Sequence, residues 1–333
     1  MTEQIMEEAI KTRVIGVDIS NERTSCAIVD IRGNILAERH FGTWEYLDAN
    51  DFVTALSSEI VTMAEENGGY ETIRSVGISA PSASALTGCI VNSPNLPWKG
   101  IVPLGAMLRD RLGMAVRMDN DSHASALGER EFGSAHGMND FIVVSLGVGV
   151  GSCFFSNGHE HKGFEGFAGE FGHMCVVDAP DARVCGCGKK GCLEAYVGAN
   201  GVARTAQELL AERSDTPSLL RDAETITAKF VSECCDKGDE IAIDTFRRTG
   251  YLLGFGLANY ASLTDPQIII LTGGVSKAGK WLMQPLRESF EEHVFRNIRG
   301  KVRLVRSMLN DRERDMLGAS VLAWEVPEYS LFK

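Results

Sequence analysis

Three cysteines and one histidine form the pattern with the clearest chemistry in this sequence. Cys185, Cys187 and Cys192 lie within eight residues, and His173 precedes them. Three thiolates and one imidazole match tetrahedral Zn²⁺ in number and in softness. Glycines alternate with the cysteines, so a short loop can wrap a metal without steric conflict. We expect a structural zinc with four protein ligands; the alternative is a Cys- and Gly-rich loop without metal.

The elements that must position this loop alternate between strand-like and helix-like patterns, which indicates an α/β fold. The helical spacing of apolar residues is clearest from Asp51 to Asn67. The predicted strands are Val14–Asp18, Thr24–Val29, Ile73–Ile78, Phe141–Leu146 and Ile268–Leu271. The predicted helices are Asp51–Asn67, Asp121–Phe132 and Asp239–Leu263.

A faint internal repeat relates two of these regions. The segment Ile15–Asp30 can be laid on Ile142–Asn157, with Cys26 on Cys153, and each segment holds a strand, a turn and a second strand. A chance match of two short hairpins is one reading. The other is a duplicated domain whose hairpin turns face a shared cleft, which suits a polyphosphate because turn N–H groups bind anions.

The segment Gly169–His173, followed by Cys185–Glu194, resembles the paired signature of the ROK (repressor, open reading frame, kinase) family. Further segments similar to that family follow its order, and the resemblance extends from Val14 to Trp324. These segments are Asn92–Trp98, Asn120–Asp121, Ser145–Gly151 and Leu271–Gly274.

The resemblance implies an actin-like, ribonuclease H-like α/β fold with two duplicated domains and an interdomain cleft. The implied N-terminal domain comprises residues 14–119 plus 312–326, and the implied C-terminal domain comprises residues 120–311 with the zinc loop. Most family members phosphorylate hexoses or N-acetylhexosamines with ATP and Mg²⁺, and others are transcriptional repressors. A glucokinase-like activity is therefore expected.

By resemblance, Asp121 is the catalytic base that accepts the proton of a sugar hydroxyl, a role compatible with a position at a helix N-terminus. His173 would bind zinc through one ring nitrogen and face the sugar with the other. The implied sugar ligands are Asn95, Asn120, Glu170, His173 and Glu194. The implied nucleotide-side residues are Asp18 (near Mg²⁺), Arg23, Gly147, Gly149, Gly151, Gly273 and Gly274.

The nucleotide side departs from the family pattern. The first phosphate turn usually reads Asp-x-Gly-Gly-Thr, whereas here Asp18 is followed by a Ser20–Arg23 turn, and Val148 replaces a usual Thr. Glu22 would place a carboxylate near the triphosphate, although Arg23 could offset that charge. Two readings stay open: an active ATP-dependent sugar kinase, or a catalytically weak sugar-binding regulator or sensor.

Composition narrows the choice of partners. The chain has 333 residues, 44% of them apolar, and a net charge of −12, which disfavours nucleic acid and favours a small-molecule partner. A DNA-binding repressor is disfavoured also because only 13 residues precede the first predicted strand. We find no apolar run of membrane-spanning length and no signal-peptide pattern, so a cytoplasmic protein is expected. The family resemblance implies a homodimer or homotetramer.

Overall fold

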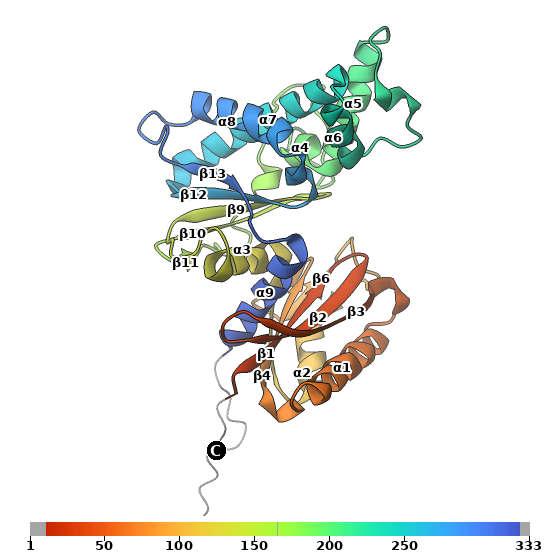
Figure 1. The fold of residues 1–333 in the computed structure, drawn as a ribbon, viewed down its shortest axis with the longest axis vertical. Coiled ribbons are helices and arrows are strands. Elements are labelled where there is room, and N and C mark those ends of the chain that lie inside the picture. Colours follow the sequence, from red (N-terminus) through yellow and green to blue (C-terminus); the bar gives the residue numbers. More distant parts are fainter. Residues whose placement is uncertain (1–10, 165, 327–333) are drawn as a thin grey trace, which may run out of the picture. The chain divides into compact units, whose positions relative to one another are not determined.

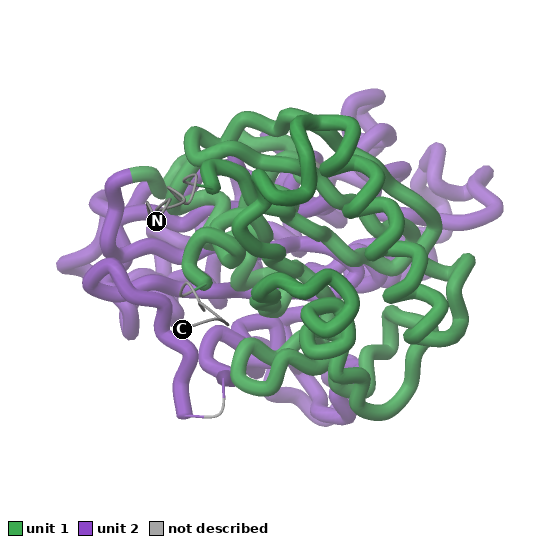
Figure 2. The backbone as a smooth tube through the Cα atoms, turned by 90° about the horizontal axis from the view of Figure 1, so that it is seen from below, with its two compact units in different colours: residues 1–136, 309–333 green, residues 137–308 purple. Residues whose placement is uncertain are grey.

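A computed structural model describes residues 11–164 and 166–326. They form two compact units, coloured separately in Figure 2. The first unit lies within residues 1–136 and 309–333, and the second comprises residues 137–308. The predicted domains change at residue 120, whereas the compact units change after residue 136. The segment between these limits contains helix α3 (Asp121–Phe132), which packs against helix α9 (Asp311–Trp324) of the first unit.

The first unit is built on a five-stranded sheet in the order β3-β2-β1-β4-β8, of which β1 to β4 are labelled in Figure 1. Its strands are β1 (Arg13–Ile19), β2 (Arg23–Asp30), β3 (Ile35–Gly42), β4 (Ile73–Ala80) and β8 (Ala115–Asn120). A small second sheet contains β5 (Ala83–Ser84), β6 (Cys89–Val91) and β7 (Ile101–Val102). The remaining helices are α1 (Ala49–Glu66) and α2 (Leu104–Leu112), with 3₁₀ turns at Thr43–Glu45 and Tyr70–Thr72.

The second unit repeats this plan with the sheet order β11-β10-β9-β12-β13. Its strands are β9 (Phe141–Leu146), β10 (Val150–Ser156), β11 (His159–Glu160), β12 (Ile268–Thr272) and β13 (Arg303–Arg306). Its helices are α4 (Glu194–Val197), α5 (Ala199–Glu212), α6 (Ala228–Asp236), α7 (Glu240–Thr264) and α8 (Lys280–His293). Its 3₁₀ turns are Phe171–His173, Leu219–Asp222 and Gly274–Ala278.

The two sheets share their strand directions. In each, an antiparallel hairpin is followed by two strands that add in parallel: β1 pairs with β2, then β4 and β8 follow; β9 pairs with β10, then β12 and β13 follow. The predicted strands and helices are all present, with ends within two residues of those expected. The two units thus repeat one sheet topology, as the duplicated-domain reading of the internal repeat predicts.

The strands of the first sheet separate two layers by simple alternation. Ile15 and Val17 of β1 pack in the cluster that includes α1 and α2, whereas Val14 packs with α9. Gly16 shares the α9 face, because a Cβ there would lie 2.6 Å from the carbonyl oxygen of Met316. This close approach lets α9 lie directly on the β1 and β4 backbone.

Candidate functional site

In the first unit, polar side chains gather where the parallel strands end. Asp18 near the end of β1 pairs in register with Ser79 of β4, and Ser79 pairs with Asp119 of β8. The carboxyl ends of parallel strands are where α/β folds place ligands. Asp18 is half-buried, while Ser79 and Asp119 are buried. This edge of the sheet therefore carries two carboxyl groups and one hydroxyl side by side.

Asn120 and Asp121 connect that edge to helix α3. Asn120 is the N-cap, and its Oδ1 accepts a hydrogen bond from the Ser122 N–H at 3.0 Å. Asp121 is exposed, and its Oδ1 accepts from the same N–H at 2.8 Å. Although the residue keeps exposed surface, surrounding atoms desolvate the carboxyl and raise the pKa of Asp121, whereas hydrogen bonds from Ser122 and the charge of His123 act to lower it. The cap bond uses the side-chain oxygen of Asn120 and leaves its side-chain NH₂ group for a ligand.

Helix α9 adds charges to the same edge. Arg314 is buried, and its guanidinium donates to Asp311 at 2.8 Å and to Asp315 at 2.9 Å. Burial, together with the negative charges of Asp315 and Asp121, raises the pKa of Asp18 to about 8. Burial likewise raises the pKa of Asp315 to about 6. Several carboxyl groups therefore share a small region with one guanidinium.

The turn from Ser20 to Arg23 is held by a hydrogen bond within it and by one from Trp44. The Ser20 Oγ donates to the Arg23 carbonyl at 2.8 Å, and the Trp44 Nε1 donates to Asn21 Oδ1 at 2.9 Å. None of these turn residues has a positive φ, so the turn holds its shape without the glycines usual in the family. In the described part of the chain, the N–H groups of Asn21 and Glu22 donate no hydrogen bond. The altered turn therefore retains two backbone donors that an anion could use.

Asn95 lies in the loop before β7. The loop is anchored by Trp98, whose Nε1 donates to the Tyr46 carbonyl at 3.1 Å and whose ring lies 4.4 Å from that of Phe52. Asn95 itself is exposed. The anchor fixes the loop and leaves the Asn95 side chain available.

In the second unit, the four predicted metal ligands meet. The ligand atoms of His173, Cys185, Cys187 and Cys192 all lie within 4.8 Å of one another. The distance from Cys187 Sγ to Cys192 Sγ is 3.7 Å, and that from Cys185 Sγ to His173 Nδ1 is 3.6 Å. Ligands at about 2.0–2.3 Å from a tetrahedral zinc lie about 3.5–3.8 Å apart. The donor set and its spacing therefore fit Zn²⁺.

Two carboxylates accompany this cluster. His173 Nε2, the ring nitrogen turned away from Cys185, lies 3.8 Å from Glu170 Oε2, and Glu170 is exposed. Glu194 begins α4, and its Oε2 accepts from the Val150 N–H at 2.9 Å. His173, Glu170 and Glu194 thus surround the metal-ligand loop as the sequence predicts, although which of them bind a sugar stays a prediction.

The glycine segments of the second unit also lie at the carboxyl ends of parallel strands. Gly147, Gly149 and Gly151 form the β9–β10 turn and the start of β10, and the Ala199 N–H donates to the Gly147 carbonyl at 2.8 Å. Gly273 follows β12 with φ of 82°, and a Cβ there would lie 2.6 Å from the Leu146 carbonyl oxygen. Gly274 has open space around it. Backbone alone can therefore approach a ligand at these turns.

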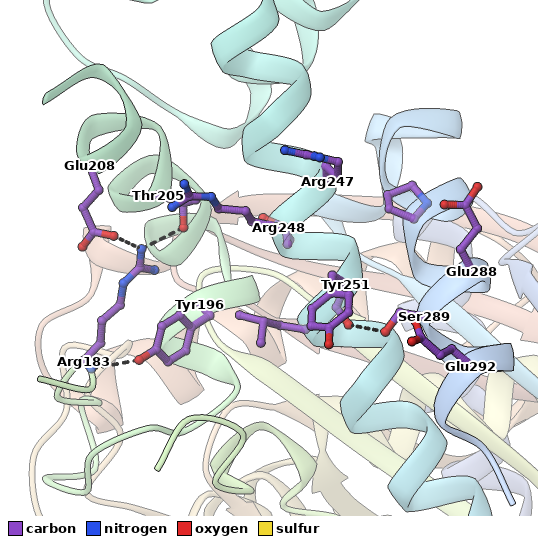
Figure 3. A pocket seen from close by; sticks show the side chains of 13 residues that line it. Arg183, Tyr196, Thr205, Glu208, Arg247, Arg248, Tyr251, Glu288, Ser289 and Glu292 are labelled. Carbon is purple, nitrogen blue, oxygen red and sulfur yellow. Dashed lines mark hydrogen bonds and ion pairs between the residues drawn. The ribbon is translucent and has the colours of Figure 1, made fainter. Parts of the chain in front are cut away.

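A cavity of about 590 Å³ lies elsewhere in the second unit, between α5, α7 and α8 (Figure 3). Arg183 and Tyr196 line one side, Arg248 and Tyr251 come from α7, and Glu288 comes from α8. None of the residues predicted to bind sugar, nucleotide or metal lines it. The cavity is therefore separate from the candidate site.

The sequence did not point to Ser79, Arg314 or Asp315. None belongs to a recognisable motif, and Arg314 and Asp315 are about 300 residues from Asp18 in the chain. Only the docking of α9 on the first sheet brings them there. No helix within the described ranges is both long and apolar enough to cross a bilayer.

Comparison with known proteins places these features in a family. Residues 14–326 match the ROK family. The chain is 32% identical to a glucokinase of Halalkalibacterium halodurans over 84% of this chain and 85% of that protein. It is also 32% identical to a glucokinase of Streptomyces coelicolor over 93% of this chain and 97% of that protein. A xylose repressor of Bacillus spizizenii is more distant, with 25% identity over 93% of this chain and 77% of the repressor.

A solved structure of a known protein has a similar fold. The ROK family glucokinase of Streptomyces griseus, in complex with glucose and AMPPNP, is 32% identical, with a TM-score of 0.77. The match covers 94% of this chain and 100% of that chain. The predicted two-domain α/β architecture is therefore confirmed, and the chain belongs to the ROK family.

Proposed function

We propose that this protein is an ATP-dependent sugar kinase that phosphorylates a hydroxyl of a glucose-like hexose or an N-acetylhexosamine. The observation that carries the proposal is the placement of Asp121. Asp121 begins α3, at the sheet edge that also holds Asp18. Glucokinases that are 32% identical over most of the chain support the same reaction.

In the proposed reaction, the oxygen of the sugar hydroxyl forms a bond to the γ-phosphorus of ATP, and Asp121 accepts the proton of that hydroxyl. The bond from that phosphorus to the bridging oxygen breaks, and ADP leaves with the electron pair. Glu170, His173 and Glu194, together with Asn95 and Asn120, would orient the sugar by hydrogen bonds to its hydroxyls. The glycine turns of the second unit and the turn at Arg23 would receive the nucleotide.

Two metal ions are part of the proposal. Zn²⁺ bound to His173, Cys185, Cys187 and Cys192 would brace the loop that carries the sugar ligands, without an open coordination position. Mg²⁺ near Asp18 would neutralise charge on the transferred phosphoryl group. Asp18 fits that role because it is a hard oxygen donor in a region with excess negative charge.

Steady-state assays of ADP release test the activity directly. Purified protein with Mg²⁺ and ATP is offered glucose, mannose, N-acetylglucosamine and N-acetylmannosamine in turn. We expect turnover with at least one of them, and Asp121→Asn should lower that turnover about 10²- to 10⁴-fold with sugar affinity changed only a few fold. The matched control is Asp110→Asn, an exposed residue of α2. Saturable sugar binding without turnover would instead favour a regulator or sensor, the alternative that the altered Ser20–Arg23 turn supports.

A further inference from the structure

We propose that Asp315 of α9 acts together with Asp18 of β1 to hold a divalent cation of the Mg²⁺ class. This inference rests on the proposed function, since the cation would serve the phosphoryl-transfer site. It adds a ligand from a helix whose residues carry no recognised motif. Three features of this region support the site: the path of α9 over the sheet, the charge balance, and a buried hydroxyl that lacks a partner among the described residues.

The path of α9 is marked by two contacts with β4. The Ser75 Oγ donates to the Ala323 carbonyl at 2.8 Å. Two residues further along β4, a Cβ on Gly77 would collide with the carbonyl of Ala319. β4 and α9 therefore run in opposite directions: each advance of two residues along β4 corresponds to four residues toward the N-terminus of α9. Four residues of helix span about 6 Å, and two residues of strand span about 6.6 Å.

The same step, taken once more, brings Asp315 of the helix to Ser79 of the strand. Ser79 shares the helix-facing side of β4 with Ser75 and Gly77, because side chains alternate along a strand. Asp18 is the register partner of Ser79 on β1. Side chains also alternate along β1, so Asp18 lies on the same α9-covered face as Gly16. The two carboxyl groups therefore approach each other over the sheet edge, and their electrostatic coupling agrees with this placement.

The charge balance shows that Arg314 does not neutralise this region. Its guanidinium is shared by Asp311 and Asp315, with Asp18 and Asp121 near them. Burial and like charges in one confined region destabilise these carboxylates in their ionised form. A bound divalent cation reverses that effect and stabilises both carboxylates. One or two carboxylates, completed by water and phosphate oxygens, are what Mg²⁺ usually takes from a protein.

The third feature that supports the cation site is the Ser79 hydroxyl. The residue has no exposed surface, and among residues 11–164 and 166–326 its Oγ has no hydrogen-bond partner of normal geometry. It nevertheless lies near enough to Asp18 to lower the pKa of that carboxyl. A buried hydroxyl without a partner is costly in a folded protein. An ionised Asp18 held by a cation, or a water bound to that cation, would give the hydroxyl an acceptor.

The simpler alternative is that Asp315 serves only to pair with Arg314. Asp311 offers a matched control for this alternative, because it lies on the same helix and binds the same guanidinium at 2.8 Å. If pairing with Arg314 were the whole role, Asp311→Asn and Asp315→Asn would have similar effects. If Asp315 holds a cation, only Asp315→Asn would impair cation binding.

The test is the binding of Mn²⁺ alone to zinc-loaded protein, followed by electron paramagnetic resonance, without nucleotide or sugar. We expect one Mn²⁺ site per chain that Mg²⁺ displaces. Asp315→Asn and Asp18→Asn should each weaken its binding at least about tenfold, and Asp311→Asn should change it less than about twofold. Equal Mn²⁺ affinity in wild type and Asp315→Asn would overturn the inference.

A second measurement avoids variants that could unfold. Fe²⁺ replaces Mg²⁺ in the wild-type protein, and ascorbate with peroxide then cuts the backbone next to the bound ion. We expect cuts near residues 18 and 315 that excess Mg²⁺ suppresses; cuts near 18 without any near 315 contradict the inference. Because neither experiment measures turnover, loss of the kinase proposal and loss of the Asp315 site remain distinguishable.

Discussion

Glu194 Oε2 accepts a hydrogen bond from the backbone N–H of Val150 at 2.9 Å, which ties the start of α4 to the start of β10. The other carboxylate oxygen of Glu194 lies 3.5 Å from Cys185 Sγ. A Cβ on Gly149 would lie 2.8 Å from Oε2, so the glycine leaves room for the carboxylate. One side chain thus connects the glycine turn with the metal-ligand loop.

Removal of this carboxylate should affect sugar binding. Glu194→Ala deletes a charged acceptor worth about 1.5–3 kcal/mol per hydrogen bond, so we expect hexose affinity to fall about 10- to 100-fold in calorimetric titrations. Glu194→Gln retains an acceptor for the Val150 N–H and should lose less. Glu233→Ala, on the exposed face of α6, is the control. Unchanged affinity in Glu194→Ala would remove this residue from the sugar site.

Metal content gives a second prediction. Purified protein should contain about one zinc per chain, because the donor set is complete and closed. Cys187→Ser should lower the zinc content and the melting temperature together, since the metal cross-links the loop. Cys175→Ser is the matched control: Cys175 is exposed, lies in the same region and is not among the four clustered donors. Equal zinc in both variants, measured by atomic emission, would contradict the site.

The contact between β4 and α9 predicts a stability effect. A Cβ on Gly77 would lie 2.7 Å from the Ala323 nitrogen and would collide with the Ala319 carbonyl. Gly77→Ala must therefore push the helix outward, at a cost of about 1–3 kcal/mol of unfolding free energy. The urea midpoint should fall accordingly. Gly274→Ala, which has open space and no positive φ, should stay within about 0.5 kcal/mol of wild type.

The buried Arg183 beside the separate cavity predicts a pH dependence. Its guanidinium donates to the carbonyls of Ala195 at 3.0 Å and Gly201 at 3.1 Å and also binds Glu208. Although desolvation acts to raise the pKa of Glu208, the hydrogen bond and charge of Arg183 hold it below its usual value. A lowered carboxyl pKa contributes stability above the pKa of the unfolded chain, and this contribution is lost as the pH falls through the folded value.

Glu208→Gln should therefore be less stable than wild type at neutral pH, and the difference should shrink toward about pH 3. Denaturation curves at several pH values measure it. Arg204→Ala removes only the exposed partner of Glu208 and should change stability by less than about 1 kcal/mol. A wild-type to Glu208→Gln difference that is constant with pH would show that the ion pair does not contribute.

Much of this protein follows from local patterns in its sequence. The spacing of His173 and the three cysteines in Cys185–Cys192 predicts a zinc site and its ligands, because ligand type and number are properties of the residues themselves. The hairpins at Ile15–Asp30 and Ile142–Asn157, and the helices at Asp51 and Asp121, follow from apolar periodicity and capping residues. Such signals need no knowledge of distant parts of the chain.

Other features exist only in the folded chain. Asp315 lies near enough to Asp18 to raise the pKa of that carboxyl because α9 crosses Gly16 and Gly77, two positions without a side chain to hold the helix away. Glu194 reaches Val150 because Gly149 leaves space for it. Both contacts join segments far apart in the sequence, so no local pattern encodes them. Sequence periodicity specifies which faces are apolar, whereas close packing between particular faces sets which polar groups become neighbours.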